Sequence, residues 1–98
     1  MPAIIRKGMD SSTSDPCGAP PRVPAAGSPN VFVNGAAAVR VGDAYDDHAC
    51  PGSPPHGATA SSGSGTVFVN GLPVHRNGDS ISCGSTGDNG SPNVFAGG

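Results

Sequence analysis

At 98 residues the chain has the length of one small domain, and only 35% of its residues are hydrophobic, so its core must be small. Glycine and proline supply 16 and 11 residues. No long stretch free of both shows the 3.6-residue apolar period of a helix, so we expect an all-β fold. A net charge of −2 with five basic residues argues against a nucleic-acid partner, which needs a basic face.

A nine-residue segment that occurs three times predicts the strands. Residues 27–35 read Gly-Ser-Pro-Asn-Val-Phe-Val-Asn-Gly, and residues 63–71 and 90–98 repeat this pattern with few changes. Each copy places a short run of β-forming residues beside turn residues, which predicts a strand that enters a tight turn.

In chain order, we expect a strand over residues 2–6, hairpins over 30–41 and 66–77, and a final strand over 92–96. The hairpins would turn at Asn34-Gly35 and Asn70-Gly71, because Asn-Gly tolerates the positive φ of a type I′ turn. The segments between them are predicted to be loops, over residues 8–24, 42–65 and 78–91.

The third copy ends the chain, and the N-terminal residues supply the continuation that it lacks. We therefore expect three hairpin units, the third of them split between the two ends of the chain. This arrangement predicts adjacent termini and a pseudo-threefold body closed on itself, which leaves few open strand edges.

An Arg-x-Gly-Asp step follows two of the copies, and residues 6–10 repeat it with one inserted residue. The Gly-Asp steps predict turns in which the aspartate side chain caps the backbone. The three arginines are either solvated strand ends or part of a threefold surface that meets acidic groups of a partner: Arg6, Arg40 and Arg76.

Each predicted loop contains a soft metal ligand, and the candidates are Cys17, His48, Cys50, His56 and Cys83. Tetrahedral Zn²⁺ takes four thiolate or imidazole ligands. A domain with a small core usually needs a bound metal, a disulfide or a partner to stabilise it. A threefold body brings the loops together, so a shared ion needs a ligand from each. We assign one structural zinc ion to Cys17, His48, His56 and Cys83. Cys50 is held in reserve, because His48 and Cys50 alternate and are expected to point apart.

These residues also have plainer interpretations. A cysteine can be a small buried hydrophobe, and His48 or His56 can be an ordinary loop residue. An odd number of cysteines without a visible signal peptide argues against a disulfide framework and indicates synthesis in a reducing compartment. His75 lies outside the loops, and we expect it in the packing or at the surface. No nucleophile elbow, phosphate-binding glycine loop or HExxH motif is present, so we expect no enzymatic activity.

The chain resembles the PAAR-repeat family. The resemblance rests on the Gly-Ser-Pro-x-Val-Phe-Val-Asn-Gly and Arg-x-Gly-Asp frames and spans residues 2–98, although the eponymous Pro-Ala-Ala-Arg segment has drifted at residues 37–40 and 73–76. We expect a single domain of this kind over residues 1–98, without the fused effector that is common in the family. The implied fold is a sharp three-faced β cone with a zinc ion near its apex. Cys17 stands where relatives often have a histidine, so the site would be a Cys2His2 variant.

The resemblance implies a mechanical function. The base of the cone would bind the blunt end of a trimeric β-helical spike by β-augmentation, one chain per trimer, in a type VI secretion system or a contractile phage tail. The tip would sharpen the spike for piercing a target-cell membrane. We expect turn residues to line the base, with nearby valines and phenylalanines filling the core: Asn34, Gly35, Asn70, Gly71, Gly97 and Gly98.

The free protein would be a monomer, cytoplasmic on synthesis and then carried to the spike tip without a signal peptide. Two other functions remain as alternatives. One is a zinc-stabilised binding module that acts alone. The other is a metal hydrolase, which needs an open coordination position on the ion.

Overall fold

The computed structural model describes residues 2–13, 21–48 and 56–97, and the side chains of residues 47, 48 and 56 lie outside this description. Its strands are β1 (Ser11–Ser12), β2 (Phe32–Val33), β3 (Ala36–Ala37), β4 (Ala44–His48), β5 (His56–Thr59), β6 (Phe68–Val69), β7 (Leu72–Pro73) and β8 (Gly87–Asp88). They form antiparallel pairs: β1 with β8, β2 with β3, β4 with β5, and β6 with β7. None of the described residues is helical, so the expected all-β class is confirmed. Consequently, the described part of the chain offers no helix long and apolar enough to cross a membrane.

The two predicted hairpins are present, and both turn where the Asn-Gly pairs stand. Asn34 and Gly35 have φ angles of 53° and 82°, and Asn70 and Gly71 have 55° and 80°. Two successive residues with positive φ are the requirement of a type I′ turn, which suits the right-handed twist of the flanking strands. The prediction of these turns is therefore confirmed.

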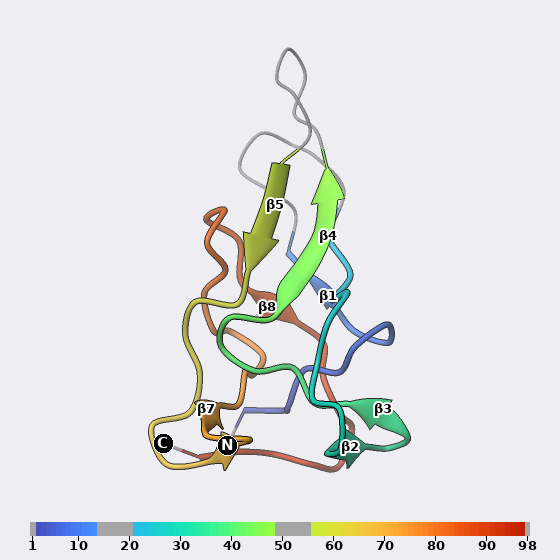
Figure 1. Cartoon of the computed structure of the whole chain (residues 1–98), viewed down its shortest axis with the longest axis vertical. Helices are drawn as coiled ribbons and strands as arrows, with labels where there is room; N and C mark the ends of the chain where they lie inside the picture. Colours follow the sequence, from blue (N-terminus) through green and yellow to red (C-terminus); the bar gives the residue numbers. More distant parts are fainter. Residues whose placement is uncertain (1, 14–20, 49–55, 98) are drawn as a thin grey trace.

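The third unit is built from both ends of the chain, as predicted. An antiparallel bridge joins Ala3 to Phe95, which is the counterpart of the Phe32–Ala37 pair between β2 and β3. The Ala96 amide donates to the Pro2 carbonyl at 3.0 Å. Figure 1 shows the two termini close together, at the end of the molecule that holds β2, β3 and β7. We call this end the base.

A closed triangle of backbone hydrogen bonds joins the three units. The Ile5 amide donates to the His75 carbonyl at 3.1 Å, the His75 amide to the Val39 carbonyl at 2.8 Å, and the Val39 amide to the Ile5 carbonyl at 3.1 Å. A second cycle joins the same three units in the opposite sense, with amides donating from Lys7 to Ala37, Val41 to Pro73 and Asn77 to Ala3. Because every unit both donates to one neighbour and accepts from the other, the body is pseudo-threefold and closed.

The apolar core has two parts. The cluster nearer the base takes equivalent residues from each unit: Ile4, Ala38 and Val74, with Val33, Val69 and Ala96. The second cluster lies beyond the triangle and contains Ile5, Val39, Tyr45, Ala58, Ala60 and Ile81.

The expectation that the phenylalanines of the repeats fill the core is wrong. Phe32, Phe68 and Phe95 are 60%, 55% and 48% exposed. Successive side chains of a strand point to opposite faces. The next residue in each copy therefore points inward instead: Val33, Val69 and Ala96.

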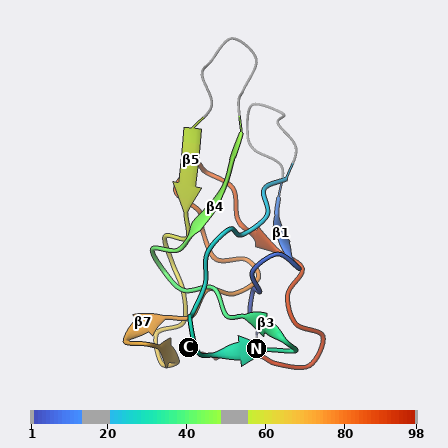
Figure 2. The ribbon, with the colours of Figure 1, turned by 45° about the vertical axis from the view of Figure 1, so that its right-hand side comes forward.

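The loops were predicted to be free of strands, and this is wrong for all three. The segment 42–65 contains the hairpin of β4 and β5, which stands at the end opposite the base in Figures 1 and 2. Tyr45, Ala58 and Ala60 anchor this hairpin to the second cluster, while Gly57 and Thr59 between them are exposed. Alanine and glycine carry too little β-propensity for this alternation to stand out in the sequence. The other two predicted loops pair with each other through β1 and β8.

Candidate functional site

Three equivalent buried serines hold the base together: Ser28, Ser64 and Ser91. Each hydroxyl oxygen accepts hydrogen bonds from the backbone amides two and three residues later, as in Ser28 with Asn30 at 3.2 Å and Val31 at 2.9 Å. This local bonding fixes the bend that leads into each strand of the base.

The same serines link each unit to the turn of the next. The Ser28 hydroxyl donates to Asn70 Oδ1 at 2.6 Å, and the Ser91 hydroxyl donates to Asn34 Oδ1 at 2.5 Å. The Ser64 hydroxyl donates to the Gly97 carbonyl. Gly97 stands where the other copies have asparagine, so its backbone oxygen replaces the missing side chain and completes the cycle.

The predicted partner-binding turns lie at the base, and their asparagine side chains are already engaged within the chain. Asn34 and Asn70 donate through Nδ2 to Asn93 Oδ1 and Asn30 Oδ1, both at 2.9 Å. Gly35 and Gly71 are exposed beside them, Gly97 is half-buried, and Gly98 lies outside the described residues. Both the Oδ1 and the Nδ2 atom of each of these two asparagines therefore bond to another unit.

Each unit contains one arginine–aspartate pair, and both earlier interpretations of these arginines are wrong. Arg6 Nε lies 2.8 Å from Asp10 Oδ2, and the Arg40–Asp43 and Arg76–Asp79 pairs have the same arrangement at 2.9 and 2.8 Å. The side chains are 2–15% exposed, so the arginines are not solvated strand ends, and their acidic partners belong to this chain. The hydrogen bond to aspartate raises the pKa of each guanidinium.

The aspartates also cap the backbone, as predicted. Asp10, Asp43 and Asp79 accept the amide hydrogen of their own arginine at 2.8–2.9 Å. The ion pair could have been predicted, because opposite charges recur at the two ends of a glycine turn in every unit. In the third unit the inserted Met9 changes the spacing from three residues to four, and the pair is retained.

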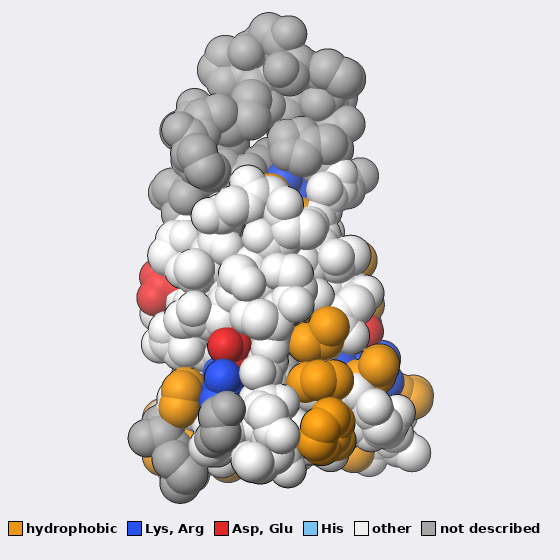
Figure 3. Space-filling model, turned by 90° about the vertical axis from the view of Figure 1, so that its left-hand side faces the viewer, with side chains coloured by type: hydrophobic (Ala, Val, Ile, Leu, Met, Phe, Trp, Pro, Cys, Tyr) orange, Lys and Arg blue, Asp and Glu red, His pale blue; other side chains and the backbone are white. Residues whose placement is uncertain are grey.

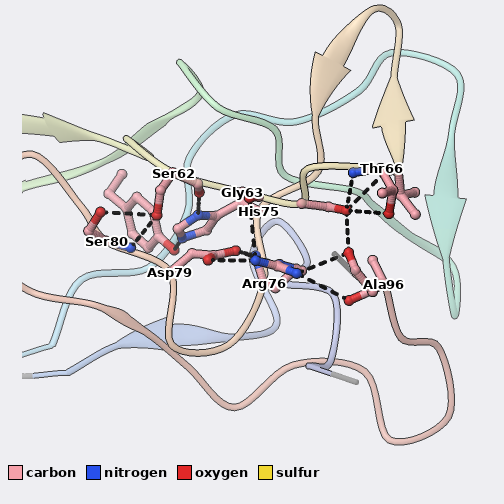
Figure 4. Close-up of polar contacts among 12 residues, drawn as sticks. Ser62, Gly63, Thr66, His75, Arg76, Asp79, Ser80 and Ala96 are labelled. Atoms are coloured by element: carbon pink, nitrogen blue, oxygen red, sulfur yellow. Dashed lines mark hydrogen bonds and ion pairs between the residues drawn. The ribbon is translucent and has the colours of Figure 1, made fainter.

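Each guanidinium continues toward the base and ties its aspartate turn to the hairpin turn. Figure 4 shows this for Arg76, which donates through Nη2 to the Gly63 carbonyl at 3.3 Å. Its Nη1 donates to the Gly97 carbonyl at 3.0 Å. Arg40 makes the corresponding bonds to the Gly27 carbonyl and to Asn70 Oδ1. The three arginines therefore brace the base from within the molecule.

His75 occupies the position that Ile5 and Val39 fill in the other units, and it is fully buried. Its Nδ1 lies 2.9 Å from the Ser62 carbonyl (Figure 4). Its Nε2 lies 2.9 Å from the Tyr45 hydroxyl. A neutral imidazole satisfies both contacts when Nδ1 carries the hydrogen and the tyrosine donates to Nε2. Burial lowers the pKa of His75 and raises that of Tyr45. His75 is therefore a packed polar residue, as one of its two predicted interpretations had it.

Large apolar side chains are exposed mainly at the base. The described residues of this kind in the two base hairpins and the C-terminal segment are Val31, Phe32, Val67, Phe68, Leu72 and Phe95, against Met9 and Val23 elsewhere. Figure 3 shows hydrophobic side chains gathered toward the base on one face, below a middle region with few of them. An apolar surface concentrated at one end of a small protein indicates an interaction site.

The structure describes the backbone of three predicted zinc ligands, and it brings the segments of these three together away from the base: His48, His56 and Cys83. His48 and His56 are directly opposed partners in the β4–β5 pair. Cys83 is half-buried against the second cluster, and its neighbour Ser82 bonds to the Thr59 backbone at the end of β5. Cys17 and Cys50 lie outside the described residues. No metal-binding group of three or more residues occurs among the side chains that the structure describes, so the four-ligand set stays a prediction.

Comparison with known proteins agrees with the threefold pattern of this site. No curated protein sequence matches the chain. A family model described as the PAAR motif matches residues 22–88 and again residues 53–98. Because these matches cover most of the chain, including two complete repeats with their Arg-x-Gly-Asp steps, the chain belongs to the PAAR-motif family.

Proposed function

We propose that this protein caps the blunt end of a trimeric β-helical spike, in a type VI secretion system or a contractile phage tail, and turns that end into a rigid point. The observation that supports this is the closed cycle of three units, each bonded to both neighbours through the same backbone atoms. Three identical chains end in three identical sets of strands, and a single chain with three similar faces can meet all of them at once. The role is mechanical rather than catalytic.

The base is the surface proposed to meet the spike. It contains the turns at Asn34-Gly35 and Asn70-Gly71 and, in the third unit, Gly97, while the predicted Gly98 lies outside the described residues. Short strands at the base can pair with the strands of a partner by β-augmentation, in which main-chain hydrogen bonds join exposed strand edges. The serine and arginine bonds described above hold the two turns and Gly97 at fixed positions relative to one another, so little ordering is needed on binding.

At the other end we propose one structural Zn²⁺, held by Cys17, His48, His56 and Cys83, with Cys50 as the reserve ligand. The opposed positions of His48 and His56 fit a shared ion, because directly paired residues of antiparallel strands are close neighbours. The bound ion would cross-link segments that have few apolar residues of their own, which is the role of closed four-ligand sites. Elemental analysis of protein purified without chelators should give about one zinc per chain, and His56→Ala should remove it.

Mixing the protein with a purified trimeric β-helical spike fragment from the same source tests the capping function. We expect a complex in which light scattering shows one added chain of 9.5 kDa per trimer. A complex with three added chains, or no complex, would contradict the proposal and favour a binding module that acts alone. In the cell, the protein would be made in the cytoplasm and carried to the spike tip with the spike, to act on a target membrane.

A further inference from the structure

The chain has three phenylalanines, and all of them are exposed at the same position of the three units. Phe32 lies in β2, Phe68 lies in β6, and Phe95 pairs with Ala3 in the unit that the two termini build. The partner residues across the pairs are equivalent too: Ala37, Pro73 and Ala3. The fold therefore presents three aromatic rings in a threefold arrangement at the base.

None of these rings belongs to either core cluster of the described residues. The inward positions beside them are filled by Val33, Val69 and Ala96, and the base cluster is complete without an aromatic residue. A chain with 35% hydrophobic residues has few large apolar side chains to place, and this one buries Tyr45 but leaves all three phenylalanines about half exposed. Single exposed apolar residues are ordinary, whereas three equivalent aromatics on one end are not.

The amount of exposed surface is sufficient for a binding site. An aromatic side chain presents about 200 Å², so the exposed fractions of the three rings leave about 300 Å² in water. Val31, Val67 and Leu72 extend this surface on two of the three units. This surface is divided among three equivalent positions of the base, so a partner that covers it must make a contact at each of the three units.

The polar groups of the base are less suited to carry the binding. The amides of Asn34 and Asn70 are used between the units, and Ser28, Ser64 and Ser91 are buried. The guanidinium groups are paired with aspartates of the same chain. The base therefore exposes its phenylalanines and valines beside asparagine amides that are already bonded between the units.

We infer that Phe32, Phe68 and Phe95 are the anchor residues of the base, and that the partner is a homotrimer whose end carries three equivalent apolar sockets around its axis. This inference rests on the proposed function and specifies it, since the anchors are side chains rather than the turn residues. Aromatic residues that fill well-packed pockets dominate protein interfaces. The threefold arrangement selects a threefold partner, because a partner with one socket leaves two rings exposed.

The test measures the affinity of single variants and a triple variant for a purified trimeric β-helical spike fragment. The changes are Phe32→Thr, Phe68→Thr and Phe95→Thr, because threonine is polar and retains β-propensity. Met9→Thr is the matched control, as an equally exposed apolar residue outside the three repeats. We expect each single change to weaken binding about 10- to 100-fold, the triple change to abolish it, and the control to leave it unchanged. Thermal unfolding followed by circular dichroism should show that all variants fold.

The outcomes separate the two proposals. If the unaltered protein does not bind the spike, the proposed function fails and the anchor assignment fails with it. If the unaltered protein binds and the triple variant binds equally well, the function stands and the anchor assignment is wrong. Self-association of the free protein that the triple variant abolishes, with unchanged spike affinity, would assign the rings to a second copy and also overturn the inference.

Discussion

The buried pair of His75 and Tyr45 makes the stability of this protein depend on pH in a defined range. His75 is neutral in the folded chain, because burial lowers its pKa and Asp79 and Asp43 are already paired with arginines. In the unfolded chain a histidine binds a proton below about pH 6.5. The unfolded state therefore binds more protons than the folded state as the pH falls below that value. The contribution is fully present above pH 6.5 and is lost on acidification, until the folded-state pKa is reached.

The size of this effect follows from the linkage relation. Each pH unit over which only the unfolded state is protonated removes about 1.4 kcal/mol from the free energy of unfolding. Between pH 6.5 and pH 5 the loss from this one residue is therefore at most about 2 kcal/mol. Unfolded carboxylates titrate near pH 4, so they contribute little in this range.

A double variant isolates the histidine from the other titrating groups. His75→Val with Tyr45→Phe places the residue of the equivalent Val39 position beside a ring without a hydroxyl group, so neither member of the pair is left with a missing partner. His48 and His56 remain in both proteins, and any zinc release affects both equally. Urea unfolding at pH 8 and pH 5 should show a larger loss of stability on acidification for the unaltered protein. Equal losses in the two proteins would refute the assignment of His75 as a buried neutral residue.

Three other predictions follow from the cycle of units and from the proposed ion. Ser91→Ala should lower the free energy of unfolding by about 1–3 kcal/mol in urea titrations, because two amides and Asn34 Oδ1 lose their partner. Gly90→Ala should destabilise the fold more than Gly35→Ala. Both glycines have a positive φ, but only at Gly90 would an added Cβ lie 2.7 Å from the Ala3 Cβ. Equal melting temperatures of the two variants would contradict this. A zinc chelator should lower the melting temperature of the unaltered protein and leave that of His56→Ala unchanged, and the same shift in both would argue against the site.

The repeats made the architecture predictable from the sequence. The Asn-Gly turns identified two hairpins directly, and the unmatched third copy identified the joining of the two ends, because a strand without a partner in a small all-β chain must find one. The register also follows from the repeats, since equivalent residues of the units pair in equivalent ways. These predictions used local turn chemistry and internal symmetry, both of which are written in the sequence.

The outward face of the base could not be predicted in the same way. Hydrophobic patterning assumes that large apolar residues point inward, so Phe32, Phe68 and Phe95 were assigned to the core. A two-residue period is equally consistent with the opposite face, and only the packing of Val33 and Val69 decides which face is buried. The β4–β5 hairpin was missed for another reason, since its buried positions are mostly alanines. Residues that break the burial rule are often those that contact something outside the chain.

Building a threefold body from one chain permits local departures from symmetry that a homotrimer cannot make. Ile5, Val39 and His75 occupy equivalent positions in the hydrogen-bonded triangle. Only His75 has side-chain nitrogens that require hydrogen-bond partners, and the Tyr45 hydroxyl and the Ser62 carbonyl are those partners. In a homotrimer the same substitution would appear three times and would require three such partners. The fold contains one β4–β5 hairpin with its Tyr45 hydroxyl, so it can supply a hydrogen-bond partner to one buried histidine at this position. At the base, Gly97 departs from the pattern as well, and there the backbone carbonyl keeps the cycle closed. Each of these deviations is therefore located where a neighbouring group compensates for it. The exposed rings, in contrast, keep their threefold arrangement. This distribution is expected if a threefold partner constrains the exposed side chains of the base and only packing constrains the interior.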